Sequence, residues 1–338
     1  MAYIYEPVVY YWDVYGNGRN TFYLFSILAD MKKFLKTFAL FGLIGFFFYV
    51  CMLCLWGEYM PQKHKPNLNY RKGSYGQMYT RINDMKKYKN VDILFLGSSR
   101  AYRVFDTRIY AKQGYYSFNL GSSSQTPIQT KLLMKRYLKQ LNPKLIVYAV
   151  DPNAFASDGV ESALDIIAND KNDRESLKML AKINHLKVFN TLIYGYYKDY
   201  IHKDKSFSES KYRNTDTYID GGYVEKKMSY FKHINHPQEA LPLHKKQINS
   251  FDEVLHMFKQ EHIPFLLVQT LVTPSAYAAI TTNDTFDNTM KAYGTYLNFN
   301  ESLHLDDSLY FFDALHMNQQ GVLRFNEKII QWLDSLEK

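Results

Sequence analysis

Four short runs of apolar residues recur along the middle and later parts of this 338-residue chain. They occupy residues 91–96, 115–120, 145–150 and 263–272. The third and fourth runs are apolar on both faces, which is typical of strands that are covered on both sides of a parallel sheet. Residues 126–141 have helical apolar spacing and separate the second run from the third. The pattern therefore predicts an α/β fold of three layers, α/β/α, built on a parallel sheet.

A longer apolar run, from Thr37 to Trp56, contains 20 residues, none of them charged. It is apolar all round, whereas a helix of a soluble protein normally has a polar stripe. As a helix it would be about 30 Å long, which matches the apolar core of a bilayer. Lysines lie on both sides of the run, so the positive-inside rule does not fix its orientation. We expect one membrane-spanning helix that is not cleaved, because no small-residue cleavage site follows before Gly57.

The rest of the pattern predicts how the chain is divided. Met31 begins a basic stretch typical of a signal anchor, so we expect little ordered structure in residues 1–30. The expected parts are a tail at 1–36, the span at 37–56, a linker with a first helix (76–87) at 57–88, and the α/β domain at 89–338. An insertion at about 156–250 interrupts the α/β alternation. Its helical apolar spacing predicts a helical lid near the site.

Composition excludes several classes of function. The chain is 46% hydrophobic and 17% aromatic, enough to bury a full core. Its cysteines, Cys51 and Cys54, both lie in the long apolar run, which leaves no disulfide framework for the α/β domain. The net charge of +8 favours anionic glycans or lipid headgroups, or is simply a solvated basic surface. Because no phosphate loop, zinc pattern, dinucleotide fingerprint or nucleic-acid motif is present, we expect no cofactor, no metal and no nucleic-acid partner.

Two short segments more than 200 residues apart carry the residues for nucleophilic chemistry. GSSR at 97–100 follows the first apolar run, and DALH at 313–316 precedes an amphipathic C-terminal helix. A serine hydroxyl becomes a good nucleophile when an imidazole takes its proton and a carboxylate orients that imidazole. A serine after a strand often only caps a helix, so GSSR is evidence for a catalytic serine only together with DALH. The two segments together predict a Ser–His–Asp site.

Two further segments, NLG at 119–121 and DPN at 151–153, follow the second and third apolar runs. With GSSR and DALH, they resemble in order and placement the four sequence blocks of the SGNH (GDSL-like) hydrolase superfamily, over roughly residues 90–335. The most similar subgroup is the membrane-anchored one that includes alginate O-acetylation proteins and the D-alanyl-lipoteichoic acid transfer protein. The resemblance implies an SGNH or flavodoxin-like sheet.

The resemblance also implies a role for individual residues. Ser99 would be the nucleophile, His316 the general base and Asp313 the partner that orients it. The oxyanion hole would consist of the Ser99 backbone N–H with Gly121 and Asn153. Such donors stabilise the charge that develops in the transition state.

The chain departs from the family pattern in two blocks. Ser98 stands where Asp is commonest, and it is the alternative nucleophile. The third block reads DPNA instead of the usual G-x-N-D, so Asp151 could act as a second carboxylate that contacts the substrate. Arg100 could hold an anionic substrate, although an arginine in the first turn of a helix usually projects to solvent.

The resemblance implies a serine esterase or O-acyltransferase that acts on ester-linked acyl groups of a cell-surface polysaccharide. It would be anchored in a bacterial inner membrane by one span, with its catalytic domain outside and a membrane-embedded O-acyltransferase as partner. Two alternatives stay open. The domain could be an inactive glycan-binding or scaffold component of a surface-polymer complex, or an esterase directed at lipids.

Overall fold

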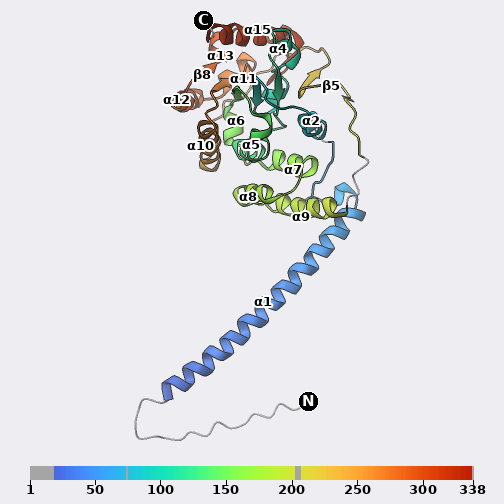
Figure 1. Cartoon of the computed structure of the whole chain (residues 1–338), viewed down its shortest axis with the longest axis vertical. Coiled ribbons are helices and arrows are strands. Elements are labelled where there is room, and N and C mark those ends of the chain that lie inside the picture. The colour runs from blue at the N-terminus through green and yellow to red at the C-terminus, as the bar shows by residue number, and fades with distance from the viewer. Residues whose placement is uncertain (1–18, 74, 202–206, 337–338) are drawn as a thin grey trace. The chain divides into compact units, whose positions relative to one another are not determined.

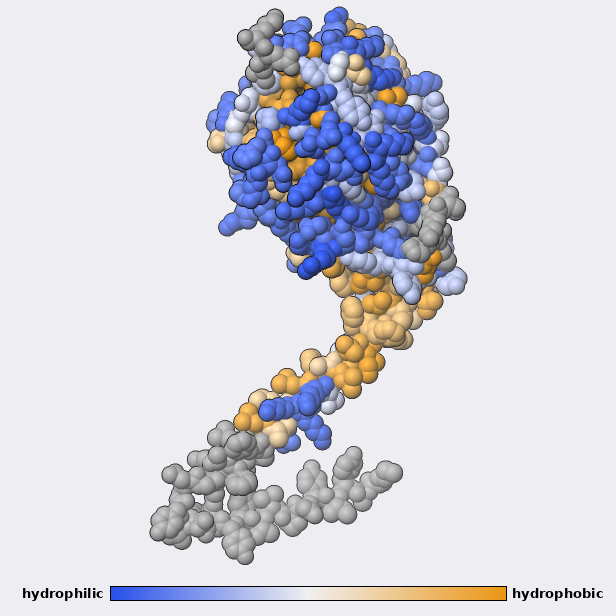
Figure 2. All heavy atoms as spheres, viewed as in Figure 1, coloured by the Kyte–Doolittle hydropathy of each residue, from blue (hydrophilic) through white to orange (hydrophobic). Residues whose placement is uncertain are grey.

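The computed structural model describes residues 19–73, 75–201 and 207–336, and the chain divides into two compact units at Tyr59 and Met60. The first unit contains one helix, α1 (Arg19–Tyr59) (Figure 1). Its stretch Ile27–Tyr59 is long enough to cross a membrane and contains an apolar window with no buried residue. In Figure 2 the helix is mostly orange, with a blue patch toward its lower end. Since α1 begins at Arg19, the expectation of little order is wrong for residues 19–30, whereas residues 1–18 lie outside the described residues.

A five-stranded parallel sheet forms the centre of the second unit, in the order β2-β1-β3-β7-β8. Its strands are β1 (Ile93–Leu96), β2 (Ser117–Asn119), β3 (Leu145–Ala149), β7 (Phe265–Gln269) and β8 (Tyr296–Asn298). All four pairings are parallel, so every strand ends at the same edge of the sheet. The predicted α/β fold with a parallel sheet is confirmed. The fifth strand, β8, was not predicted.

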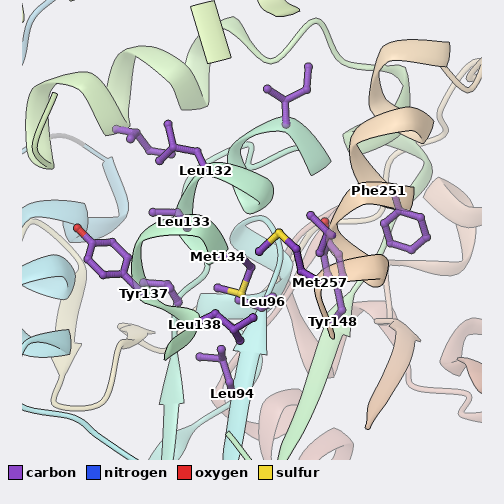
Figure 3. Close-up of a cluster of buried hydrophobic side chains, with 14 of the residues drawn as sticks. Leu94, Leu96, Leu132, Leu133, Met134, Tyr137, Leu138, Tyr148, Phe251 and Met257 are labelled. Carbon is purple, nitrogen blue, oxygen red and sulfur yellow. The ribbon is translucent and has the colours of Figure 1, made fainter. Parts of the chain in front are cut away.

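Side chains alternate between the two faces of this sheet, and each face packs against its own helices. Leu94 and Leu96 of β1 point toward α5 (Pro127–Leu141) and α10 (Lys245–Gln260), as Figure 3 shows. Ile93 and Phe95 point the other way and join a core with α4 (Thr107–Lys112) and α15 (Gln319–Leu336). Burying a side chain of this size stabilises the fold by about 1.5–3 kcal/mol. The helix layers thereby fix where the strand ends lie.

The segment between the apolar helix and the sheet is part of the second unit, not a free linker. It contains the 3₁₀ turns η1 (Gln62–His64) and η2 (Tyr75–Gln77) and the helix α2 (Met78–Met85), close to the predicted first helix. The Asn69 backbone N–H donates to Thr191 Oγ1 at 3.0 Å, and the Gly73 backbone N–H donates to Asn169 Oδ1 at 2.7 Å. The segment is therefore packed against the insertion.

The predicted insertion begins with helices and ends with strands. Helix α6 (Pro152–Ala156) leads into it, and α7 (Val160–Asn169), α8 (Arg174–Ile183) and α9 (Leu186–Ile201) lie inside it. They are followed by a three-stranded antiparallel sheet of β4 (Tyr212–Arg213), β5 (Asp216–Ile219) and β6 (Tyr223–Lys226). The prediction of a helical insertion is thus right for its first part and wrong for its second. We call β4, β5 and β6 the added sheet.

Short elements occupy the chain beyond β7, between the sheet and its last helix. They are α11 (Pro274–Ala279), α12 (Asn283–Tyr293), α13 (Phe299–Ser302), α14 (Asp307–Tyr310) and the strand pair β9 (Phe311–Asp313) and β10 (His316–Met317). The pair β9–β10 is antiparallel and leads directly into α15. A tight two-stranded turn of this kind brings residues 313 and 316 opposite each other.

Candidate active site

Ser99 is held at the sheet edge by a sharp turn after β1. Gly97 has φ +135°, and a Cβ there would lie 2.6 Å from the Ala149 carbonyl oxygen, so only glycine allows this approach of β3. Ser98 then caps the short helix α3 (Ser99–Tyr102), its Oγ accepting from the Arg100 backbone N–H. Ser99 is therefore the first residue of α3 and is half-buried.

The turn between β9 and β10 places the His316 imidazole beside Ser99 and the Asp313 carboxylate behind the imidazole. His316 Nε2 lies 2.8 Å from Ser99 Oγ, although the two residues are 217 positions apart. On the other side of the ring, His316 Nδ1 lies 2.9 Å and 3.0 Å from the two carboxylate oxygens of Asp313. Because a carboxylate only accepts hydrogen bonds, the ring proton belongs on Nδ1, which leaves Nε2 to accept from the Ser99 hydroxyl.

The Asp313 carboxylate is kept ionised by its neighbours. Burial alone would raise its pKa. The hydrogen bond with His316, and those from the backbone N–H groups of Leu315 and His316, outweigh burial and hold the pKa of Asp313 below its ordinary value. An ionised carboxylate at this position favours the imidazolium that forms when Ser99 loses its proton.

The imidazole is also supported from its face, by groups that the sequence did not reveal. The Phe312 ring stacks on His316 with centroids 5.5 Å apart and planes inclined by 4°. Two cations lie near Phe312, the Arg103 guanidinium at 5.9 Å and the Lys226 ammonium at 5.5 Å from the ring centroid. Asp216 of the added sheet binds both, with shortest distances of 2.7 Å to Arg103 and 3.6 Å to Lys226. The added sheet is thus linked to His316, the candidate base, by the two cations that lie near the Phe312 ring.

Gly121 and Asn119 pack against the turn that carries Ser99. The Gly121 backbone N–H donates to Asn119 Oδ1 at 3.1 Å, so this predicted oxyanion donor is already engaged. The Asn119 side-chain amide donates to the carbonyl oxygens of Ala101 and Phe105 and is fully buried. Asn119 therefore joins the end of β2 to α3 and to the segment that follows α3.

The side chains of Ser98 and Asp151 form a hydrogen bond with each other. Ser98 Oγ donates to Asp151 Oδ2 at 3.1 Å, and the other carboxylate oxygen caps α6 by accepting from the Ala154 backbone N–H. Asp151 is 3% exposed, and both of its oxygens are used inside the protein. The structure therefore gives no support to Asp151 as a substrate contact, and it gives the alternative nucleophile Ser98 a carboxylate partner in place of an imidazole.

Asn153 and Arg100 keep donors that no described residue uses. Asn153 follows β3, is half-buried, and its amide makes no hydrogen bond within the described part of the chain. Arg100 is 4% exposed, so the expectation that it projects to solvent is wrong. The Ser99 backbone N–H likewise has no acceptor among the described residues, as is usual at the first position of a helix.

Similarity to known proteins was found among solved structures. No protein-family model and no curated protein matches the chain. Among solved structures, a Bacteroides fragilis protein named a "putative acylhydrolase" has a TM-score of 0.43 and 13% identity, covering 78% of this chain and 99% of that one. A Bacteroides thetaiotaomicron GDSL-like lipase has a TM-score of 0.38 and 12% identity, with coverages of 78% and 100%. Likeness this distant does not establish an activity.

Proposed function

We propose that this chain is a serine esterase or O-acyltransferase that works through an acyl-serine intermediate. The observation that carries the proposal is the unbroken line of hydrogen bonds from Ser99 through His316 to Asp313. Helix capping does not explain Ser99, because Ser98 is the residue that caps α3, and capping would not require an imidazole 2.8 Å from the Ser99 hydroxyl with a carboxylate behind it.

In the proposed reaction, Ser99 Oγ attacks the ester carbonyl carbon while its proton passes to His316 Nε2. The bond to the ester's alcohol oxygen then breaks, and His316 returns the proton to that leaving oxygen. The acyl group is now an ester of Ser99. Water or a sugar hydroxyl attacks this ester in turn and gives its proton to His316 Nε2. The acyl–Oγ bond then breaks, and His316 returns the proton to Ser99 Oγ. Hydrolysis and transfer share every step up to the choice of this second nucleophile.

The negative charge on the carbonyl oxygen needs hydrogen-bond donors during both attacks. The Ser99 backbone N–H and the Asn153 side-chain amide are the donors we propose, because no described residue occupies them. Gly121 would join only after releasing Asn119. Each donor is typically worth about 3 kcal/mol in the transition state.

We propose ester-linked acyl groups of a cell-surface polysaccharide as the substrate. In this proposal α1 anchors the protein in a bacterial inner membrane, the catalytic unit lies outside, and a membrane-embedded O-acyltransferase supplies or receives acyl groups. Support for this comes from the four sequence blocks that resemble the membrane-anchored subgroup, together with the long apolar helix. Tethering favours transfer, because an anchored protein stays beside a membrane-bound donor.

The test is covalent labelling of the full-length chain in detergent with a fluorophosphonate probe, in which Ser99 Oγ would displace fluoride from phosphorus. We expect rapid labelling of the wild type, loss of labelling in Ser99→Ala and His316→Ala, and retained labelling in Ser98→Ala. Glycan and lipid esters would then be compared as substrates, with and without a sugar acceptor.

Absence of labelling in the folded wild type would overturn the proposal and favour an inactive glycan-binding or scaffold component. Labelling together with turnover of dispersed lipid esters, and none of acylated glycans, would replace the polysaccharide with a lipid substrate. Circular dichroism of each variant separates loss of the nucleophile from loss of the fold.

A further inference from the structure

Arg100 differs from the other deeply buried arginines of the described chain in having no partner. The Arg136 side chain, 1% exposed, binds the carboxylates of Asp170 and Asp173. Arg81, fully buried, donates to two backbone carbonyl oxygens and lies on the Tyr102 ring. The Arg100 guanidinium makes neither a hydrogen bond nor an ion pair with any described residue, and its Nη2 is fully enclosed.

A guanidinium in that state is costly for the fold. Nη2 carries two N–H donors and part of a permanent charge, and enclosing such a group without a partner costs about 1–3 kcal/mol or more. If the side chain at position 100 served only for packing, an apolar residue there would avoid this cost. An uncompensated buried arginine is therefore better explained by a ligand that supplies the missing negative charge.

The position of Arg100 says where that ligand would lie. Arg100 follows Ser99 directly in α3, beyond the end of β1. Polar groups that no described residue uses also follow the next two strands on one side of β1: the Asn153 amide after β3, and Thr270 Oγ1, which is 1% exposed, after β7. Because β1, β3 and β7 are parallel neighbours, all three groups lie at the edge that carries Ser99.

We propose that Arg100 binds an anionic group, a carboxylate or a phosphate, on the same substrate molecule whose ester Ser99 attacks. This inference rests on the proposed function and narrows it to acidic substrates. The planar fork of a guanidinium matches the two oxygens of either anion, whereas a neutral sugar would leave the charge uncompensated. Acidic polymers of both kinds exist, so the chemistry common to them is what Arg100 recognises.

The experiment measures how strongly small anions protect Ser99 from the fluorophosphonate probe in the full-length chain, at constant ionic strength. Glucuronate supplies a carboxylate, glycerol 1-phosphate supplies a phosphate, and glucose and glycerol are the neutral counterparts. We expect one of the anions to slow wild-type labelling and its neutral counterpart not to. The anion that protects identifies a uronate-type or a phosphate-type substrate.

Arg100→Gln should require about tenfold more of the protecting anion, as expected when a charge-assisted pair is lost. Arg100→Lys keeps the charge but loses the fork, and should fall between the two. Arg324→Gln, an exposed arginine of α15, is the matched control and should behave as the wild type. Equal protection by anions and neutral compounds, or full protection of Arg100→Gln, would overturn the inference.

A second measurement separates this inference from the proposed function. If the wild type does not react with the probe, the esterase proposal fails, but anion binding can still be read from the melting temperature. Glucuronate or glycerol 1-phosphate, but not its neutral counterpart, should raise the melting temperature of the wild type and not that of Arg100→Gln. If Arg100→Gln does not fold, Arg100→Lys carries the test, and wild-type-like protection of that variant together with no anion preference would reject the inference.

Discussion

At the scale of single residues, Asp313 decides which nitrogen of His316 carries the proton. Its pKa is lowered, because the hydrogen bonds from His316 and the backbone exceed the opposing effect of burial. A carboxylate with a lowered pKa in the folded state stabilises the fold above its ordinary pKa, about 3.9. That contribution is lost as the pH falls through the folded-state value. Around neutral pH, Asp313 therefore remains a charged acceptor for the His316 Nδ1 proton.

Replacing Asp313 with Asn should slow the labelling of Ser99 by about 10²–10⁴-fold, because an amide can donate to Nδ1 and trap the wrong tautomer. The rate of fluorophosphonate labelling at pH 7 measures this. Asp306→Asn is the control, since Asp306 only caps α14 and Asn caps a helix equally well. Equal rates for Asp313→Asn and the wild type would show that His316 is not oriented by Asp313.

Sequence patterns revealed part of the site and missed the rest for a physical reason. Ser99, Asp313 and His316 stand in short local motifs, and the structure brings these three together. The ion pair of Arg103 with Asp216 joins positions 113 apart, and such a contact leaves no local pattern. Phe312 adjoins Asp313 in sequence, yet its stacking on His316 depends on the turn between β9 and β10.

At the scale of elements, the added sheet is fixed to the central sheet by a glycine turn. Gly222 has φ +94°, and a Cβ there would lie 2.1 Å from the Asn119 carbonyl oxygen. The Asn119 backbone N–H in turn donates to the Gly221 carbonyl oxygen at 2.7 Å. The end of β2 and the turn between β5 and β6 therefore touch backbone to backbone.

Gly222→Ala should lower the free energy of unfolding by about 3 kcal/mol or more, because strain in φ adds to a backbone clash. Gly114→Ala is the matched control: Gly114 has φ +87° with open space around its Cβ position, so it reports the φ strain alone, about 1 kcal/mol. Chemical denaturation measures both. Similar losses in the two variants would mean that the close approach at Asn119 costs nothing.

The ion pairs of the added sheet predict a pH dependence. Burial would raise the pKa of Asp216, but its bonds with Arg103 and Lys226 lower it. Asp216→Asn should therefore cost about 2 kcal/mol of stability at neutral pH. That difference from the wild type should persist above pH of about 3.9 and shrink as the pH falls further. Melting temperatures of both proteins from pH 7 to pH 3 test this, and a difference that grows in acid would contradict it.

The fold was predictable where burial is continuous in sequence. The strands β1, β2, β3 and β7 lie within the predicted apolar runs, because covered strands need apolar residues on both faces. β8 is short and only half-buried, so it has no such run. The added sheet is rich in polar residues, since the described strand β4 is exposed and β5 is mostly half-buried. The sequence feature that indicated a turn in this region was the Gly221-Gly222 pair, between β5 and β6.

At the scale of the whole molecule, α1 and the second unit have opposite surface characters. Leu43, Ile44 and Phe47 near the middle of α1 are more than half exposed, with no described protein cover. A soluble protein rarely exposes apolar surface of this length, whereas a bilayer would cover it. The helix is therefore the part of the chain that we expect to decide where the protein resides.

Ile44→Arg should weaken membrane retention, because an arginine at the centre of a span costs about 2.5–3.5 kcal/mol. The fraction of protein left in the membrane after alkaline carbonate extraction measures this. Phe34→Arg, placed among the lysines before the charge-free run, is the control and should be retained. Full retention of Ile44→Arg would show that α1 is not the anchor.

The separation of Ser99 and His316 in the sequence also determines the order in which the two residues are synthesised. A ribosome synthesises the serine 217 residues before the imidazole, a delay of about 10–40 s at ordinary rates of translation. During that interval Ser99 has no base and is an ordinary hydroxyl. Helix α1 is made before either residue, so the chain can reach its membrane while it is still chemically silent. Under the proposed function, Ser99 becomes reactive only once β10 has been made and has placed His316 beside it.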